Sequence, residues 1–421
     1  MNDKLISGID IGSSKIATIV GIESEEHDEL RIIGYNTTPS RGVKRGLIVD
    51  IDKVTAAIDE SVEKAERMGG HKVSRVLVSV GGPHIASLNS HGVVAVSHPQ
   101  GEISEDDVMR VIEAARAISL SSTKQIIEVS PRDYVVDGQP GIKNPVGMTG
   151  VRLEVDTHLI TASMTNLNNI ERSLSHLGLE NAGYVFAGLA SSEAVLTDTE
   201  KELGAVVADI GGGKIDICVY VEGALSYSSS IPIGAKHITN DIAVGLRVSL
   251  DSAEKIKLHL SRIMQDPAVR HKKDMALNLS VLQIPEELSE VSLKTVIDGI
   301  IGPRLEEIYK LIFDEIEKSG FSNSIPSGLI LTGGGALTIG MLETGRRILG
   351  LPIRIGIPSG VTGLVDEILN PPSATTVGLL LNGQKNIMDD TKWNSMNKVF
   401  NNFSIGSSFA KVKDIFKQFI P

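Results

Sequence analysis

Residues 206–220 read VVADIGGGKIDICVY, and this stretch decides the fold that we expect. It has the pattern of a buried strand that ends at Asp209, a turn of three glycines (Gly211, Gly212 and Gly213), and a second strand. Because glycine has no Cβ, the backbone amides of such a turn can approach a ligand closely and form an anion-binding pocket. An acid beside bound phosphates is compatible with them when Mg²⁺ lies in between. The alternative is an ordinary β-hairpin in which the glycines only provide turn geometry.

The same pattern occurs a second time, near the N-terminus. Residues 8–20, GIDIGSSKIATIV, align with residues 207–219, so that Asp10 matches Asp209. Two strand-acid-turn-strand units half a chain apart predict a duplicated α/β fold of two lobes. We expect the two turns to face each other across a cleft in which a nucleotide binds. The residues of the first turn are Gly12, Ser13, Ser14 and Lys15.

Composition limits the class of protein. A chain of 421 residues is too long for one ordinary core, and 41% hydrophobic with 22% charged residues is typical of a soluble globular protein. The net charge of −11 argues against nucleic-acid binding, which needs a basic face. The single cysteine, Cys218, excludes an intrachain disulfide and a cysteine-based zinc site. We find neither a signal-peptide pattern nor an apolar run of about 18 residues that could span a membrane.

Changes of pattern along the chain predict its domain organisation. The segment from 84 to 163 differs from its surroundings and contains a cluster of Pro and Gly, which indicates an inserted α+β subdomain. Residues 183–196 are expected to form a strand that passes into a second strand. The expected division is a first-lobe core at 1–83 and 164–203, the insertion at 84–163, a second-lobe core at 204–248, an outer subdomain of that lobe at 249–325, further core with a closing helix at 326–385, a linker at 386–408 and a terminal helix at 409–421.

Three more features are candidates for the cleft. Residues 327–340, SGLILTGGGALTIG, predict a third strand and glycine turn followed by a helix, which suits phosphate or ribose oxygens and involves Gly334 and Gly335. A helix at 249–261 would present Glu254 and Lys257 on one face, either as a solvated pair or as contacts to a ribose and base. Glu193 could face the cleft or lie on a helix surface. No turn has the Walker A or the GxGxxG spacing.

The last thirteen residues, FAKVKDIFKQFIP, predict an amphipathic helix that is too short to span a membrane. Residues 391–421 contain five Lys and one Asp, so this end is basic in an acidic protein. The combination favours a helix that lies in an anionic membrane surface, and the alternative is docking on the protein's own core. The apolar half of the helix consists of Phe409, Val412, Ile415, Phe416, Phe419 and Ile420.

The three glycine turns, in the contexts DIGSSK, DIGGG and LTGGG, resemble those of the actin/Hsp70/sugar-kinase superfamily. The segment GLASSEAVL before the second turn belongs to the same resemblance. Within that superfamily the chain resembles the FtsA family of bacterial cell-division proteins over essentially its whole length. This closer resemblance rests on GVKRGLIVDID, the insertion after GGPH, the PRLEEI run around Arg304 and the amphipathic terminus.

The resemblance implies an actin-like, ribonuclease-H-like fold that binds ATP and Mg²⁺. It implies self-assembly into filaments, peripheral attachment to the cytoplasmic side of the cell membrane at the division site, and tethering of the tubulin-like FtsZ through its C-terminal peptide, together with other divisome proteins. Arg304 would belong to the peptide-binding surface, although a helix pair with Glu307 is the alternative. By position, the phosphates would contact Gly12–Lys15 and Gly211–Lys214, the metal would lie near Asp10 and Asp209, adenosine would contact Glu254, Lys257, Gly334 and Gly335, and the catalytic candidates would be Asp209 and Glu193.

Two residues depart from the superfamily pattern. Lys214 stands where the second turn commonly continues with Thr, whose hydroxyl can serve phosphate; we therefore expect ATP binding with weak or absent hydrolysis. Leu258 stands where some members place an adenine-stacking Arg. Two other functions remain open at this point. A small-molecule kinase would need a further catalytic acid over a sugar pocket, and a pilus-assembly adaptor of the same fold would lack the amphipathic tail.

Overall fold

The computed structural model describes residues 4–23, 29–97, 100–264, 276–286, 290–364 and 368–388. Within these ranges, no helix is both long enough and apolar enough to cross a bilayer. The expected linker and amphipathic helix lie outside the described residues, and so do all six residues assigned to its apolar half: Phe409, Val412, Ile415, Phe416, Phe419 and Ile420.

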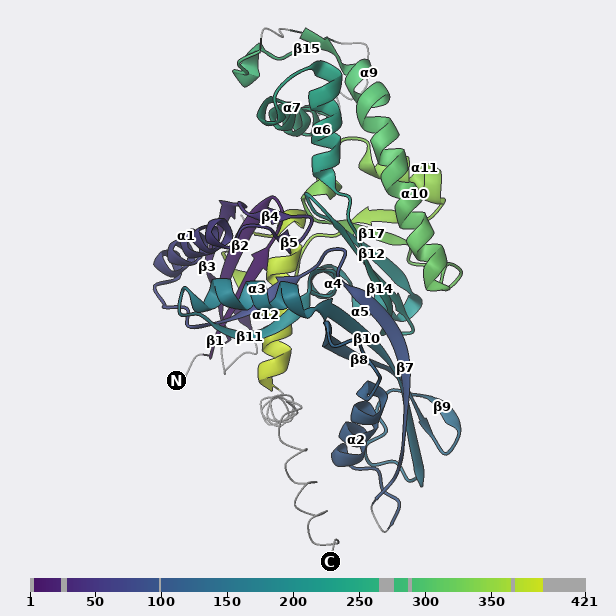
Figure 1. Cartoon of the computed structure of the whole chain (residues 1–421). Helices are drawn as coiled ribbons and strands as arrows, with labels where there is room; N and C mark the ends of the chain where they lie inside the picture. The colour runs from purple at the N-terminus through teal and green to yellow at the C-terminus, as the bar shows by residue number, and fades with distance from the viewer. Residues whose placement is uncertain are drawn as a thin grey trace, which may run out of the picture.

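Two sheets with the same strand order form the two lobes, which confirms the predicted duplication (Figure 1). In each sheet, three consecutive strands form an antiparallel meander. Two further strands lie beside the first strand of the meander and run parallel to it. The first-lobe order is β11 (Glu180–Phe186), β6 (Arg75–Val80), β1 (Lys4–Ile11), β2 (Lys15–Glu23), β3 (Leu30–Pro39) and the short β19 (Thr362–Gly363). The second-lobe order is β18 (Ile353–Ile355), β17 (Leu329–Thr332), β12 (Ala205–Ile210), β13 (Ile215–Val221) and β14 (Ala224–Ile231).

Amphipathic helices cover these sheets. Helix α1 (Ile51–Gly69) begins at Asp50, whose side chain accepts from the amide of Lys53, and it ends at Gly70 in the left-handed conformation. It packs on β2 and β3 of the first lobe, and α3 (Met164–Ser175) contacts it. The second lobe carries α6 (Ala235–Leu246), α7 (Leu250–Ile263), α9 (Leu293–Val296), the π turn η2 (Ile297–Ile301), α10 (Gly302–Ser319) and α11 (Met341–Leu349).

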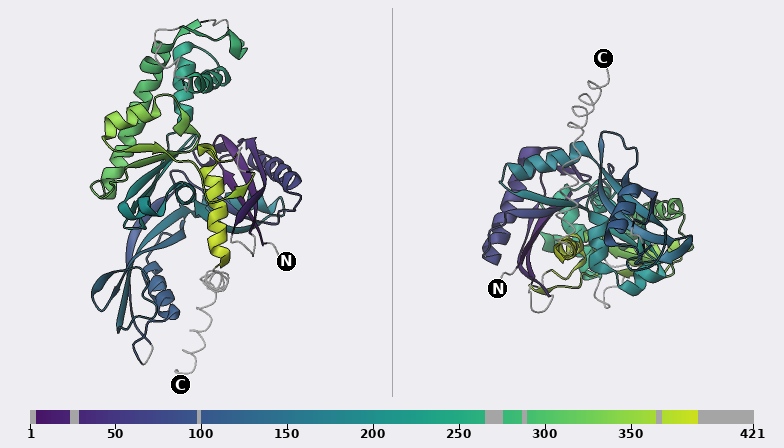
Figure 2. Two further views of the ribbon diagram at one scale, coloured as in Figure 1. Left: turned by 180° about the vertical axis from the view of Figure 1, so that it is seen from behind. Right: turned by 90° about the horizontal axis from the view of Figure 1, so that it is seen from below.

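Two helices, α4 (Ala187–Val195) and α12 (Ala374–Met388), pack against each other where the lobes join. Helix α12 also packs against β1 of the first lobe, and Figure 2 shows it running between the lobes. The two helices cross so closely that a Cβ on Gly378 would lie 1.7 Å from the carbonyl oxygen of Ala190. Only glycine fits at that crossing without moving the backbone.

The prediction of two strands over residues 183–196 is wrong in its second half. Strand β11 ends at Phe186, and the helix α4 follows directly. All of its residues except Glu193 are buried, so the sequence shows no polar face with helical spacing. The third glycine turn also differs from expectation, because Gly334 and Gly335 belong to the short 3₁₀ turn η3 (Gly334–Leu337) and α11 begins only at Met341.

The inserted subdomain is an antiparallel sheet with one helix and a small core of its own around Val111, Leu153 and Val155. It docks on β14 of the second lobe through hydrogen bonds. Nε2 of His158 lies 2.7 Å from Oγ of Ser228, and the Ser87 hydroxyl donates to the carbonyl of Ser228 at 2.6 Å. Its elements are β7 (Ala86–Ala95), α2 (Glu105–Arg116), β8 (Lys124–Val136), β9 (Gln139–Ile142) and β10 (Arg152–Ser163), with sheet order β7-β10-β8-β9.

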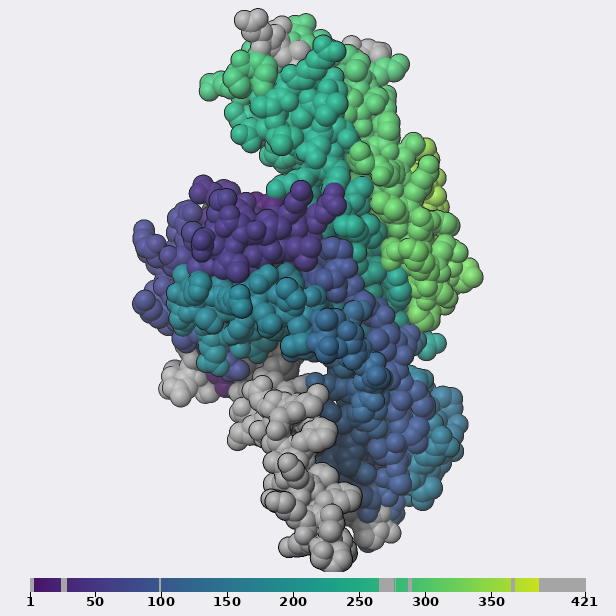
Figure 3. Space-filling view, in the orientation of Figure 1, coloured from purple at the N-terminus to yellow at the C-terminus, as the bar shows by residue number. Residues whose placement is uncertain are grey.

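The outer subdomain of the second lobe stands at the opposite end of the molecule from this insertion (Figures 1 and 2). Besides α7, α9, η2 and α10 it contains the two-stranded sheet of β15 (Ala276–Asn278) and β16 (Glu290–Ser292), and α6, which the expected division assigned to the second-lobe core, packs against α7, η2 and α10 of this subdomain. Figure 3 shows the molecular surface indented between this subdomain and the first lobe.

Candidate functional site

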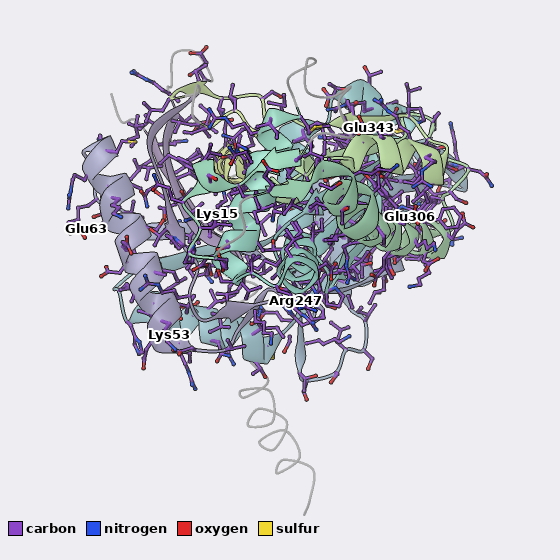
Figure 4. The ribbon with its side chains drawn as sticks, turned by 90° about the horizontal axis from the view of Figure 1, so that it is seen from above. Lys15, Lys53, Glu63, Arg247, Glu306 and Glu343 are labelled. Carbon is purple, nitrogen blue, oxygen red and sulfur yellow. The ribbon has the colours of Figure 1, made fainter. Side chains whose placement is uncertain are left out.

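The two glycine turns of the duplicated units lie face to face. Each is closed by the same hydrogen bond, from Gly12 N to Lys15 O at 3.0 Å and from Gly211 N to Lys214 O at 2.9 Å. A Cβ on Gly212 would lie 1.8 Å from Oγ of Ser14 in the opposite lobe. The turns of the two lobes therefore meet at one place, as the duplication predicts. Figure 4 shows Lys15 between α1, which carries Lys53 and Glu63, and the second-lobe helices that carry Glu306 and Glu343.

Helix α6 holds the second turn and reaches the first. The amides of Ala235 and Lys236 donate to the carbonyls of Gly211 and Gly212, each at 2.9 Å. The ammonium group of Lys236 then crosses to the first lobe and donates to the carbonyl of Ser13 at 2.7 Å. Burial lowers the pKa of Lys236, while the nearby carboxylate of Glu254 opposes this shift. A cation thus connects the two turns.

Two acids end the strands that lead into the turns, and a hydroxyl group holds each of them. Ser79 donates to Oδ1 of Asp10 at 2.5 Å, and Thr375 of α12 donates to Oδ2 of Asp209 at 2.8 Å. Burial raises the pKa of Asp209 to about 6, and the negative charges of Asp216 and Asp10 add to the shift. In the part of the chain that the structure describes, no three His, Cys, Asp or Glu side chains are grouped to hold a metal ion.

Lys214 is paired inside the protein. Its ammonium group contacts the carboxylate of Asp216, which lies directly across the β12–β13 pair from Asp209. Burial by itself would lower the pKa of Lys214. The negative charges of Asp216 and Asp209 have the larger effect, so the pKa of Lys214 is raised. The same ammonium group lies so close to Gly81 that a Cβ there would be 2.2 Å from it. Lys214 is therefore a counter-ion to the acids, and it can reach a phosphate only by leaving Asp216.

The third glycine turn packs over the end of β12. Gly333 has φ of +79°, and a Cβ on it would lie 2.2 Å from Oδ1 of Asp209. Gly335 packs on Ile210 in a similar way, because a Cβ on it would lie 2.3 Å from Cγ2 of that side chain. By contrast, nothing lies within 4 Å of a Cβ on Gly334. The third turn therefore lies beside the second, with Gly334 on its open side.

Helix α7 presents its Glu–Lys pair towards α6. Lys257 donates to Glu254 at 2.8 Å and to Oγ1 of Thr239 at 2.9 Å, and its side chain is 7% exposed, whereas that of Glu254 is 42% exposed, so the pair has one buried and one exposed member. The hydroxyl of Ser261 accepts from the amide of Ile339 at 3.1 Å, which ties α7 to the segment after the third turn. Two exposed leucines, Leu258 on α7 and Leu337 on η3, are apolar surface on these two elements.

Two predicted residues lie elsewhere or have other partners. Glu193 forms ion pairs with Lys201 and with Lys385 of α12, and none of its contacts among the described residues involves a glycine turn. The structure therefore does not place Glu193 in the cleft-facing orientation that the sequence suggested. Arg304 binds Asp241 of α6 through two nitrogens, at 2.5 and 3.0 Å, and also contacts Glu307, so the helix pair that the sequence allowed is present.

The sequence predicts a basic turn within residues 41–52, but it does not place this turn at the site. Strands β4 (Val43–Lys44) and β5 (Leu47–Ile48) are joined by Arg45 and Gly46, both with positive φ, and the amide of Gly46 donates to Oγ of Ser13 at 3.0 Å. The signal was present, because a glycine preceded by a polar residue between two short apolar segments indicates a two-residue hairpin turn. It did not indicate which part of the molecule the turn touches.

Family comparisons agree with this architecture. Residues 82–161 match the family model described as the SHS2 domain inserted in FTSA, and residues 206–378 match the model of the cell division protein FtsA. The chain is 37% identical over 380 residues to the cell division protein FtsA of Pseudomonas aeruginosa, covering 90% of this chain and 89% of the relative. It is 37% identical over 401 residues to that of Borreliella burgdorferi, covering 95% and 94%. For Escherichia coli K12 the identity is 34% over 391 residues, covering 91% of each.

Solved structures show the same fold at much lower identity. A chain of the PilM–PilN type IV pilus biogenesis complex matches with a TM-score of 0.59 at 16% identity, over 90% of this chain and 98% of that one. MreB5 of Spiroplasma citri bound to ADP matches with a TM-score of 0.52 at 12% identity, over 92% and 98%. These similarities establish the actin-like fold, with the SHS2 domain as its inserted subdomain.

Proposed function

The chain belongs to the FtsA family of cell division proteins, and from that membership we propose that it binds ATP and tethers FtsZ filaments to the membrane. A role in cell division follows from the family itself. The nucleotide, the membrane attachment and the partners are proposals, and each rests on different residues. The observation that carries the proposal is the meeting of the two glycine turns, because a pair of opposed backbone pockets suits the phosphates of one nucleotide.

The residues at this seam fit a nucleotide. Gly212 and Gly213 pack so closely against Ser14 and Ser13 that only glycine fits there, so backbone groups line this contact, and the surface is hollowed between the first lobe and the outer subdomain. The phosphates would contact the two turns, with Lys236 as the nearest cation. The adenosine would lie near Gly334, Glu254 and Lys257, between Leu258 and Leu337. In support, MreB5 of the same fold has been solved with ADP and with AMPPNP.

The acids at the strand ends fit Mg²⁺. Mg²⁺ keeps several of its waters and needs only one or two protein carboxylates beside the phosphates. Asp10 and Asp209 lie next to the turns. Burial raises the pKa of Asp209, and a bound cation would stabilise the charged form of this carboxylate. When bound, the metal would neutralise phosphate charge. Lys214 already supplies one positive charge to the same acids.

We infer that the nucleotide acts mainly as a conformational ligand. Asp209 remains the catalytic candidate, because it ends β12 beside the second turn, whereas Glu193 is engaged by two lysines. Lys214 replaces the hydroxyl that commonly follows the turn, and it is bound to Asp216. Hydrolysis is therefore weak or absent. A small-molecule kinase would need a second acid over a sugar pocket, whereas Asp10, Asp209 and Asp216 at the turns are engaged by Ser79, Thr375 and Lys214.

We assign membrane attachment to the terminal segment 409–421 and FtsZ binding to the outer subdomain. There Arg304 lies at the α6–α10 junction, between Asp241 and Glu307. An arginine that two carboxylates hold in place still has N–H groups that can bind part of an acidic peptide. Self-assembly into filaments would multiply these weak contacts along the membrane, where other divisome proteins also gather. The site of action is the cytoplasmic face of the cell membrane, at the division site.

Co-sedimentation with anionic vesicles tests this function. We expect the full chain to carry FtsZ into the vesicle pellet in the presence of ATP. Phe416→Glu should leave both proteins in the supernatant, and Arg304→Glu should leave only FtsZ there while the chain still sediments. Retention of FtsZ in the supernatant with the unchanged chain contradicts the tether. Sedimentation of Phe416→Glu with vesicles contradicts the membrane anchor. Electron microscopy on lipid monolayers with and without ATP would show whether filaments form.

A further inference from the structure

The β4–β5 hairpin inserts its tip between three turns of the site. The amide of Gly46 donates to Oγ of Ser13 in the first turn. The Cα of Arg45 lies 3.3 Å from the position of a Cβ on Gly213 in the second turn. A Cβ on Gly46 would lie 2.2 Å from the carbonyl oxygen of Gly81, which begins the Gly81–Gly82 turn after β6. The backbone of the tip is thus in contact with all three turns, while the side chains of Lys44 and Arg45 are exposed.

The hairpin carries an unused positive charge to this place. Arg45 has φ of +51°, a left-handed conformation that is uncommon for residues other than glycine, asparagine and aspartate. The side chains of Lys44 and Arg45 are exposed, and within the described ranges neither has an ion pair or a side-chain hydrogen bond. Strained, solvent-exposed residues of this kind persist where the surrounding contacts fix them, and they cluster at ligand-binding sites.

The neighbours of each turn residue give the order of the groups along the cleft. Gly212 faces Lys236, whose charge interacts with Glu254 and Lys257 of α7. Gly213, the next residue, lies against the Ser13 side chain and against the backbone Cα of Arg45. A nucleotide whose adenosine lies at α7 would therefore extend its phosphates past Gly212 and Gly213 towards the hairpin. The terminal phosphate would come closest to the tip.

We propose that Arg45 is the residue that recognises the terminal phosphate and so distinguishes ATP from ADP, an inference that rests on the proposed nucleotide site. A guanidinium group binds phosphate oxygens through two parallel hydrogen bonds and stays charged at every physiological pH. ADP, which is one phosphate shorter, leaves Arg45 exposed. Through the Gly46–Ser13 hydrogen bond, the hairpin then makes the position of the first turn depend on which nucleotide is bound.

Titration calorimetry of the full chain with ATP and with ADP, in Mg²⁺ buffer, tests this role. The variant Arg45→Asn removes the charge but keeps the turn, because asparagine tolerates the left-handed conformation. Lys44→Ala is the matched control, since it removes an equally exposed charge one residue away. We expect the unchanged chain to bind ATP about tenfold more tightly than ADP. Arg45→Asn should lose this preference, because it binds ATP more weakly while its ADP affinity is unchanged. Lys44→Ala should keep the preference. Arg45→Lys should keep only part of it.

Each other outcome counts against a defined part of the account. If the unchanged chain binds ATP and ADP equally, or if Arg45→Asn lowers both affinities by the same factor, the assignment of Arg45 is wrong while the nucleotide site stands. If Lys44→Ala loses the preference as fully as Arg45→Asn, the effect is one of general charge and the assignment also fails. If the unchanged chain binds neither nucleotide, the proposed function fails, and the role of Arg45 fails with it.

Discussion

Gly212 of the second lobe lies so close to Ser14 of the first that a Cβ on the glycine would be 1.8 Å from the serine hydroxyl oxygen. The two residues come from opposite lobes and occupy equivalent regions of the two duplicated turns. Their contact means that any side chain at position 212 must displace Ser14 or separate the lobes. It also means that a ligand between the turns touches both lobes at once, so that binding and lobe closure are coupled.

Gly212→Ala should weaken ATP binding by at least about tenfold, because the new methyl group would displace Ser14 of the first turn or separate the two turns, and overpacking of this kind costs about 1–3 kcal/mol. Titration calorimetry with ATP measures the loss. Gly299→Ala is the control. Gly299 lies outside the site, and nothing is within 4 Å of a Cβ at that position. Equal ATP affinity in Gly212→Ala and the unchanged chain would remove position 212 from the site.

Lys214→Met should destabilise the protein, because it leaves the buried carboxylate of Asp216 without its cation. Breaking a buried ion pair from one side costs about 3–5 kcal/mol. In Lys214→Met/Asp216→Asn neither charge remains, and we expect the melting temperature to recover most of the loss. A double-mutant cycle of melting temperatures tests this coupling. Strictly additive losses would show that the two side chains do not depend on each other.

Acid should loosen the docking of the inserted subdomain through His158. Burial, together with the charge of Arg132, lowers the pKa of His158 to about 4 from its ordinary value of 6.5. The fold therefore favours the neutral ring, whose stabilising effect is complete above pH 6.5 and is lost as the pH falls from 6.5 towards 4. The melting temperature measured across this range should fall less steeply in His158→Gln than in the unchanged chain.

The control for the acid effect is His71→Gln, which removes an exposed histidine far from the docking surface. Its pH profile should follow that of the unchanged chain. If His158→Gln also follows that profile, His158 does not account for the acid sensitivity.

Gly378→Ala should destabilise the junction of α4 and α12. The added Cβ would meet the carbonyl oxygen of Ala190 at 1.7 Å, and neither backbone can yield without moving its helix. We expect a loss of about 1–3 kcal/mol or more in the free energy of unfolding, although Gly→Ala is favourable in an unhindered helix. Urea denaturation followed by circular dichroism measures it. A more stable Gly378→Ala protein would mean that the helices can separate at no cost.

The parts of the fold that could be predicted are those with a local signature. The two strand-acid-turn-strand units are recognisable because glycine turns need particular residues at particular positions, and their repetition predicts both the duplication and the facing turns. Helices with one apolar face, such as α1 and α7, also follow from spacing. The helix α4 did not, because it is buried nearly all round and its residues carry no periodic pattern.

The parts of the site that could not be predicted depend on contacts between distant segments. Thr375 holds Asp209 from a helix 166 positions away, and Ser79 holds Asp10 from the neighbouring parallel strand. Lys214 stands at a position in the sequence that suits a phosphate ligand. Only the folded structure shows that it forms an ion pair with Asp216. The hairpin tip at Arg45 and Gly46 was visible as a turn, but its position between Ser13 and Gly213 is a property of the assembled lobes.

Whether both turns hold one nucleotide can be measured by hydrogen exchange of the full chain with and without ATP and Mg²⁺. Peptides covering Gly12–Lys15 and Gly211–Lys214 should gain protection together, at the same ATP concentration, along with peptides from α7 and η3. Protection of one turn without the other, or of neither turn at ATP concentrations that saturate binding, would show that the two turns do not hold one nucleotide.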